Sequence, residues 1–325
     1  IGGNRSQVAF LGNIFAKLGY VVVANDYRVG FFLPSQISTT LAVLRGSHDM
    51  KACVRYLKKT VAEDGNPYGI DPDRIIIGGV SAGAISAIHA AYLNLDSQVP
   101  AYMANDTAGL GGMEGNSGSP GYSSEPLAVL SFSGTIGDSS WIVPGSAPIC
   151  SIHEENDGTV PYLTQEVSVS GFATGLIASG SGDLHIRAEN VGIDNCLLTY
   201  RGVALHVGYL SGTPDQQALD FARDFCANMV CDGTSDCSSV DAVIASISEV
   251  ERNTIEAYPN PTTDVLNFST EEITSVEVVD VTGRVVLSTV SQLGKNRLDV
   301  NALPTGVYTL RTVGEKISTA HFIKK

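Results

Sequence analysis

The chain has 325 residues, 43% of them hydrophobic, which is enough to bury a large core and suggests two domains. Its 34 acidic residues outnumber its 20 lysines and arginines, and the formal net charge is −14. Nucleic acids and anionic membranes bind basic surfaces, so neither is expected as a partner, and small or neutral substrates fit better. No apolar run approaches the roughly 18 residues that span a bilayer, so we expect no membrane-spanning segment.

The chain begins at Ile1 rather than Met, and no positively charged, apolar signal segment precedes its first residues. We therefore expect the natural protein to have further residues upstream. Six cysteines permit disulfides in an oxidising compartment. We expect at least one disulfide within the C-terminal cluster of Cys226, Cys231 and Cys237, and we expect Cys53 to be free and buried on its helix.

Helix and strand patterns alternate along the first 230 residues. Helix patterns cover residues 8–18, 50–57, 82–93 and 213–230. Apolar strand patterns cover residues 21–23, 74–77, 127–130, 148–152 and 197–200. In the last helix, Thr213 is expected to cap the N-terminus, with Pro214 in the first turn and Gln216 completing a capping box. This alternation predicts an α/β domain in which helices flank a mostly parallel sheet.

Residues 94–126 interrupt the alternation. They are rich in Gly, Ser, Asn and Pro and have no sustained period, so we expect a long surface excursion. Two interpretations stay open for it, a mobile lid over the functional site and an ordinary variable insertion.

The composition changes after Cys231, first to Asp, Ser, Thr and Gly and then to short strands. These strand patterns lie at residues 276–279, 285–287 and 307–310. Short alternating strands separated by turns predict a small β-sandwich. We therefore expect an α/β domain at residues 1–237, a linker at 238–257 and a C-terminal β-domain at 258–325.

The strongest chemical signal in the first domain is Gly79-Val80-Ser81-Ala82-Gly83, which directly follows an apolar strand and directly precedes a helix. That context is the one a nucleophile elbow requires. The turn strains the backbone of its serine and brings the residues two positions either side close together, so glycine is expected at both places. We predict that Ser81 is a nucleophile.

A serine hydroxyl is a poor nucleophile at neutral pH and needs a histidine to take its proton and an acid to orient that histidine. Downstream of an elbow the chain order is acid and then histidine. We predict Asp157 as the acid because it lies in a loop after the strand that ends at Ile152. The rival acids are Glu154, Glu155 and Asp138. We predict His206 as the base because it follows the last strand and precedes the terminal helix, with His153 and His185 as rivals.

The oxyanion formed in acyl transfer needs two backbone N–H donors, and the residue after the nucleophile supplies one. That residue is Ala82. The second donor normally comes from a glycine-rich loop, and Gly2 and Gly3 are read as the tail of such a loop, most of which lies upstream. No metal-ligand spacing is present at residues 153–155 or 232–236, so neither a metal nor another cofactor is expected.

Residues 1–230 resemble the carboxylesterase and acyl-ester hydrolase branch of the α/β-hydrolase superfamily. Three segments carry the resemblance beside the elbow, at residues 19–28, 68–75 and 153–162. The last is similar to the family's acid loop, with Asp157 at the acid position, but Glu154 and Glu155 stand where small residues are usual. The HGGG segment of the family is absent from this chain. The resemblance implies ester hydrolysis through an acyl-enzyme intermediate.

Residues 258–325 resemble the C-terminal sorting domain of the type IX secretion system of Bacteroidetes. The matching segments are Tyr258 to Thr262, Val278 to Arg284 and Leu303 to Tyr308. The resemblance implies that the type IX secretion machinery is a partner, and that the protein passes through the periplasm and outer membrane and is secreted or held at the cell surface. The alternative for this region is a carbohydrate-binding or adhesive β-module.

The leading hypothesis is therefore a secreted serine carboxylic-ester hydrolase with Ser81, His206 and Asp157 as its catalytic triad. Its substrate would be a small-molecule or polymer ester. A second hypothesis is a serine peptidase on the same fold, because amides and esters share the tetrahedral intermediate. A third is a non-catalytic surface binding protein.

Overall fold

In the computed structural model, the described residues are all of 1–325 except 1–3, 29, 31–33, 104–107, 170–171, 232, 236, 243–252, 272, 281–283 and 314–316. The chain divides into two compact units, Ile1–Ile244 and Ala245–Lys325, and each is described by itself. Within the described part of the chain, no helix has both the length and the apolar character needed to cross a membrane.

The first unit is built on a five-stranded sheet with the order β1-β2-β4-β7-β8, in which all neighbours are parallel. Its strands are β1 (Ile76–Val80), β2 (Ala128–Phe132), β4 (Ile149–Glu154), β7 (Asn195–Tyr200) and β8 (Val240–Asp241). Four of them were predicted. Because β8 pairs with β7, the first unit extends beyond the boundary that the sequence predicts at residue 237.

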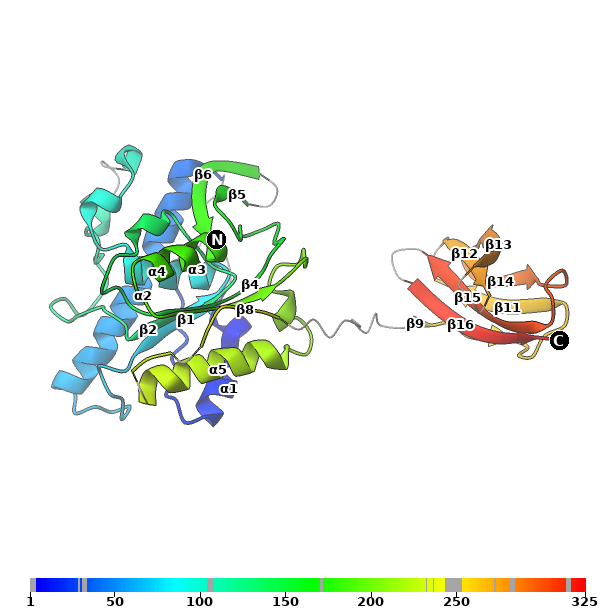
Figure 1. The fold of residues 1–325 in the computed structure, drawn as a ribbon, viewed down its shortest axis with the longest axis horizontal. Helices are drawn as coiled ribbons and strands as arrows, with labels where there is room; N and C mark the ends of the chain where they lie inside the picture. Colours follow the sequence, from blue (N-terminus) through cyan, green and yellow to red (C-terminus); the bar gives the residue numbers. More distant parts are fainter. Residues whose placement is uncertain are drawn as a thin grey trace. The chain divides into compact units, whose positions relative to one another are not determined.

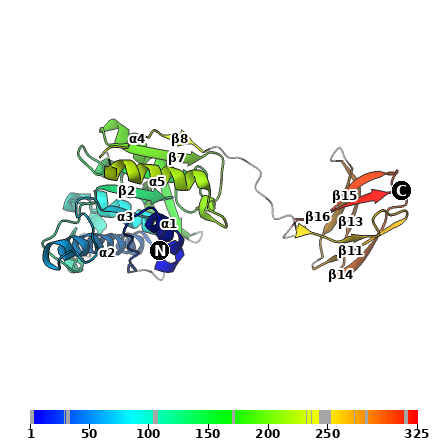
Figure 2. The ribbon, with the colours of Figure 1, turned by 90° about the horizontal axis from the view of Figure 1, so that it is seen from below.

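Helices cover both faces of this sheet (Figures 1 and 2). One face is covered by α1 (Ala9–Lys17) and α5 (Gln216–Cys231), and the other by α2 (Gln36–Glu63), α3 (Ala82–Tyr92) and α4 (Ser181–Asn190). Each face has its own apolar core: Phe225 of α5 packs in one, and Ile88 of α3 in the other. Strands buried on both faces read as apolar runs rather than alternations, which is why they stand out in the sequence. The predicted α/β-hydrolase fold is confirmed.

A small antiparallel sheet, absent from the sequence prediction, lies beside the main one. It consists of β3 (Thr135–Ile136), β6 (Phe172–Gly180) and β5 (Gln165–Val169) in that order. The short 3₁₀ helices of the unit are η1 (Arg5–Val8), η2 (Asp96–Gln98), η3 (Ala101–Met103), η4 (Ala108–Leu110), η5 (Ser139–Trp141) and η6 (Gly208–Leu210).

Three local predictions were wrong. Val21, Val22 and Val23 do not form a strand, and about half of each is exposed. A strand exists only if a neighbour accepts its backbone hydrogen bonds, and β1, at the edge of the described sheet, pairs with β2 alone. Asp215, not Thr213, caps α5: its side chain accepts the N–H of Gln217 at 2.9 Å.

The third wrong prediction concerns His185, which was expected to decorate the edge of a strand. His185 lies in α4 and is buried, as are Leu184 and Ala188 of the same helix. The alternation that suggested a strand is only five residues long, and the buried positions match one face of a helix equally well.

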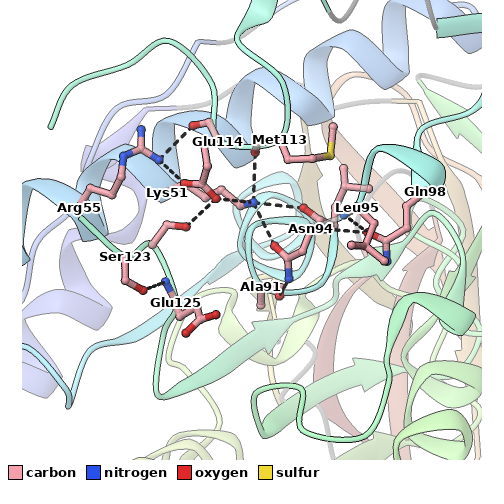
Figure 3. Close-up of polar contacts among 12 residues, drawn as sticks. Lys51, Arg55, Ala91, Asn94, Leu95, Gln98, Met113, Glu114, Ser123 and Glu125 are labelled. Carbon is pink, nitrogen blue, oxygen red and sulfur yellow. Dashed lines mark hydrogen bonds and ion pairs between the residues drawn. The ribbon is translucent and has the colours of Figure 1, made fainter. Parts of the chain in front are cut away.

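Two buried cations of α2 hold the excursion at residues 94–126 in place (Figure 3). The ammonium of Lys51 donates to the main-chain oxygen of Met113 at 3.1 Å and to the side chain of Asn94 at 3.1 Å. Both Lys51 and Arg55 pair with the carboxylate of Glu114, at 3.3 and 2.6 Å. Removing the partner of a buried cation strongly destabilises a protein, so these contacts favour a fixed position for residues 113–118 against α2.

The second unit contains two sheets around a shared apolar core. One sheet has the order β10 (Ala257–Tyr258), β11 (Val265–Thr270), β14 (Gly294–Asp299). The other has the order β13 (Val285–Val290), β12 (Ser275–Val279), β15 (Gly306–Val313), β16 (Ile317–Lys324), β9 (Asn253–Thr254). The core includes Leu266, Phe268 and Leu310. The three predicted strands are present as β12, β13 and β15.

One disulfide is present among the described residues, between Cys196 on β7 and Cys237. It links the C-terminal cluster to the sheet instead of joining two members of the cluster. Cys226 and Cys231 are free, the first buried and the second exposed. Cys53 is free and half-buried in α2.

Candidate active site

Three polar residues lie just beyond the carboxyl ends of three parallel strands. Ser81 follows β1 directly, Asp157 lies in the loop after β4, and His206 lies in the loop after β7. The carboxyl ends of parallel strands lie at one edge of the sheet, and in open α/β sheets that edge is where functional sites form. The fold thereby brings together residues that are up to 125 positions apart in the sequence.

Ser81 occupies a strained backbone conformation, with φ 53° and ψ −116°. A side chain at Gly79 would place its Cβ 2.3 Å from the carbonyl carbon of Gly83, so only glycine fits there. A Cβ at Gly83 would meet nothing within 4 Å, so the expectation that both positions require glycine is correct only for Gly79. Strain of this kind persists only where the surrounding structure enforces it. The strained conformation makes the side chain of Ser81 project from the strand–helix turn.

A hydrogen-bonded chain joins the three side chains. The Nε2 atom of His206 lies 2.7 Å from the Oγ of Ser81, and its Nδ1 lies 2.6 Å from the Oδ2 of Asp157. The carboxylate is fully buried, whereas 22% of the His206 side chain is exposed. This arrangement lets Nδ1–H donate to the carboxylate while Nε2 accepts the hydroxyl proton.

Asp157 is held as a carboxylate by four donors. Burial acts to raise the pKa of Asp157, but hydrogen bonds from His153 and His206 and from two backbone N–H groups outweigh it and lower the pKa well below its usual range. The backbone donors are Thr159 at 2.8 Å and Val160 at 3.0 Å, both to Oδ1. A permanently charged acid can stabilise the imidazolium that forms when His206 takes a proton.

His153, a rival for the base, lies on the far side of this acid. Its Nε2 is 3.4 Å from the Oδ2 of Asp157 and 3.2 Å from the main-chain oxygen of Val160, while its Nδ1 is 2.8 Å from the Oγ of Ser181. The side chain is fully buried. His153 therefore buttresses the acid, a contact that the sequence prediction missed.

The other rivals have partners elsewhere. The carboxylate of Glu155 pairs with Arg201 at 2.9 Å, and the carboxylate of Asp138 caps η5 by accepting the N–H of Ser140 at 2.8 Å. The Nδ1 of His185 is 2.7 Å from the side-chain oxygen of Asn195. None of these contacts involves Ser81.

Glu154, the last residue of β4, is fully buried and points at the loop that carries His206. Its carboxylate accepts hydrogen bonds from the backbone N–H groups of Val207 and Gly208 and from the hydroxyl of Ser133. The sequence prediction missed these contacts, because Val207 and Gly208 lie 53 and 54 residues downstream of Glu154. The available signal was a charged residue at the end of a buried strand, because a charged side chain is almost never fully buried without a partner.

The N-terminus of α3 lies next to Ser81, because α3 begins at Ala82. The first N–H groups of a helix have no acceptor within it and, with the helix dipole, favour a negative charge. The other predicted donors, Gly2 and Gly3, lie outside the described residues. No cluster of three or more His, Cys, Asp or Glu side chains that could hold a metal ion occurs within the described ranges.

Two family models match the chain. Residues 256–325 match the secretion system C-terminal sorting domain, and residues 2–115 match BD-FAE, an esterase-like α/β-hydrolase domain. No curated protein matches the sequence.

Solved structures of an esterase resemble the first unit. Three of them are of esterase 2 from Thermogutta terrifontis, and each match covers 70% of this chain. The apo form has 20% sequence identity and a TM-score of 0.47, with 79% of its own chain covered, and the butyrate-bound form has 20% identity and a TM-score of 0.49, also with 79% covered. The form phosphorylated by paraoxon has 21% identity and a TM-score of 0.47, with 78% of its own chain covered.

The first unit thus has the α/β-hydrolase fold, and the match of residues 2–115 to BD-FAE supports a carboxylesterase-type hydrolase. Residues 256–325 match a type IX secretion sorting domain, so the protein is exported to the cell surface or the extracellular space.

Proposed function

We propose that the protein hydrolyses carboxylic esters through a covalent acyl-enzyme formed on Ser81. The observation that carries this proposal is the unbroken hydrogen-bonded chain from the hydroxyl of Ser81 through His206 to Asp157. It has the order and the geometry of a serine hydrolase triad, with both contacts within hydrogen-bond reach.

In the first half of the reaction, the Oγ of Ser81 attacks the ester carbonyl carbon while its proton passes to Nε2 of His206. The tetrahedral intermediate then collapses, the bond to the alkoxy oxygen breaks, and His206 returns the proton to the departing alcohol. Asp157 remains ionised throughout and stabilises the imidazolium, consistent with its lowered pKa. The acyl group is left on Ser81 as an ester.

In the second half, water replaces the alcohol. His206 takes a proton from the water as it attacks the acyl carbon, and then donates it to the Oγ of Ser81 when the acid product leaves. In both halves a negative charge develops on the carbonyl oxygen. We assign Ala82 as one of its donors, because the N–H groups at the start of α3 lie beside the nucleophile. The segment that includes Gly2 and Gly3 is our candidate for the second donor.

The test compares p-nitrophenyl esters with peptide anilides on the natural full-length protein. We expect hydrolysis of the esters, little hydrolysis of the anilides, and loss of ester hydrolysis in Ser81→Ala. Comparable triads lose on the order of a million-fold in kcat when the nucleophile is removed. Retention of more than about a hundredth of the activity in Ser81→Ala would refute the assignment, and preferential hydrolysis of anilides would favour the serine peptidase.

His206→Ala should remove most of the rate, because Nε2 of His206 is the group that lies 2.7 Å from the Oγ of Ser81 and can take its proton. The matched control is His185→Ala, which removes a histidine that contacts Asn195 instead of the triad. Loss of ester hydrolysis in His185→Ala but not in His206→Ala would overturn the choice of base.

A further inference from the structure

One buried side chain, Glu154, binds the backbone of the loop directly after His206. Glu154 accepts the N–H of Val207 at Oε2, at 3.1 Å, and the N–H of Gly208 at Oε1, at 2.5 Å. The hydroxyl of Ser133 donates to Oε2 at 3.1 Å. Each oxygen of the carboxylate therefore holds one of the two backbone groups directly after the catalytic histidine.

Val207 needs such support because its backbone is left-handed, with φ 49° and ψ 32°. A β-branched residue rarely adopts this conformation, which costs on the order of 1–3 kcal/mol and persists only where other contacts enforce it. Val207 is the immediate neighbour of His206, so the backbone angles of Val207 determine how the backbone of His206, and with it the imidazole, is oriented relative to Gly208. A relaxed Val207 would swing the ring away from the line between Ser81 and Asp157.

The contacts also require an acceptor at both oxygens, and the ionised form of Glu154 provides this without presenting a proton of its own. Burial raises the pKa of Glu154 above its usual value, and the hydrogen bonds from the N–H of Gly208 and the hydroxyl of Ser133 offset this rise only in part. The ionisable groups that act on it are Asp157 and the phenols of Tyr200 and Tyr209.

We propose that Glu154 is a positioning residue: its carboxylate fixes the backbone of Val207 and Gly208 and so holds the imidazole of His206 between Ser81 and Asp157. This role rests on the proposed function, because it acts through the base of that reaction. Glu154 does not touch the reacting atoms.

The deciding variant is Glu154→Gln, which keeps the size of the side chain. Because the two backbone N–H groups bond to different oxygens, an amide must set its NH₂ group against one of them, whichever way it is turned. We expect kcat for p-nitrophenyl esters to fall by about 10- to 100-fold with KM within about twofold, since a displaced base slows chemistry without changing substrate binding. The matched control is Glu155→Gln, whose carboxylate contacts Arg201 and Gly202 at the start of the same loop and neither Val207 nor Gly208, and it should retain kcat within about threefold.

A second variant separates positioning from general packing. Glycine adopts left-handed angles without strain, so Val207→Gly should restore part of the lost kcat when it is added to Glu154→Gln. If Glu154→Gln does not fold, judged by circular dichroism, Glu154→Asp takes its place, because it keeps the charge but withdraws the oxygens by one methylene. The same fall in kcat is expected there.

A kcat within threefold of wild type in folded Glu154→Gln, or a rise in KM at constant kcat, would overturn the positioning role while leaving Ser81 as the nucleophile. A wild-type protein that hydrolyses no ester, and that behaves the same after Ser81→Ala, would instead overturn the proposed function and the role of Glu154 with it.

Discussion

Replacing Cys237 with serine removes the bond between β7 and the segment that leads into β8. The two bonded cysteines are 41 residues apart in the sequence. A cross-link that closes a loop of this size stabilises the folded state by about 4 kcal/mol in the chain-entropy description. For the 244 residues of the first unit, an unfolding entropy of about 2.1 cal/mol/K per residue gives a total unfolding entropy of about 0.5 kcal/mol/K. Dividing the lost stability by this entropy gives the shift in melting temperature. The melting temperature should therefore fall by about 8 °C.

The assay is thermal unfolding of the first unit, followed by circular dichroism in the absence of reductant. Cys231→Ser is the matched control, because Cys231 is an exposed free thiol, and it should melt with the wild type. Reductant should lower the melting temperature of the wild type and not that of Cys237→Ser. If Cys237 of the wild type were alkylated without reductant, or if the two variants melted together, the disulfide and the stability derived from it would be wrong.

Three further predictions concern the elbow, the acid and the tail. Gly79→Ala should abolish folding or ester hydrolysis, because its Cβ would lie 2.3 Å from the backbone of Gly83. Gly83→Ala should retain activity, because its Cβ would meet nothing within 4 Å, and parallel activity assays of the two variants check both expectations. The pKa of Asp157 is lowered in the folded protein, so its contribution to stability is present above its unfolded pKa of about 3.9 and is lost as the pH falls toward the folded value. Urea unfolding from pH 5 to pH 2 should therefore show a steeper loss of unfolding free energy in the wild type than in Asp157→Asn. Deletion of residues 256–325 should leave ester hydrolysis intact and abolish export, measured by activity in culture medium and cells, and secretion of the shortened protein would contradict the role of the tail.

The parts of the fold that were predicted correctly are those with a local signature. The strand before Ser81, the elbow itself and the helix after it are contiguous, and their apolar and glycine pattern is complete within about 20 residues. Asp157 and His206 could be chosen because the order of a triad along the chain limits the candidates. The structure places these three side chains within hydrogen-bond reach of one another.

The features that were missed depend on contacts between distant segments. The apolar run at residues 21–23 has a strand pattern, but a strand also needs a neighbour, which no pattern within three residues reveals. Glu154 looks like part of a solvated acidic loop until the loop after β7 folds over it. The partner of Cys237 is likewise fixed by where β7 lies in the sheet, so spacing alone favoured a cysteine nearby in the sequence.

The central claim is that Ser81 becomes covalently acylated during turnover. The most direct measurement treats the natural full-length protein with a fluorophosphonate that mimics the tetrahedral intermediate, and then maps the adduct by peptide mass spectrometry. The account predicts one adduct, on Ser81, that forms much more slowly in His206→Ala and does not form in Ser81→Ala. An adduct on another residue, or an active wild type that is not labelled, would contradict it.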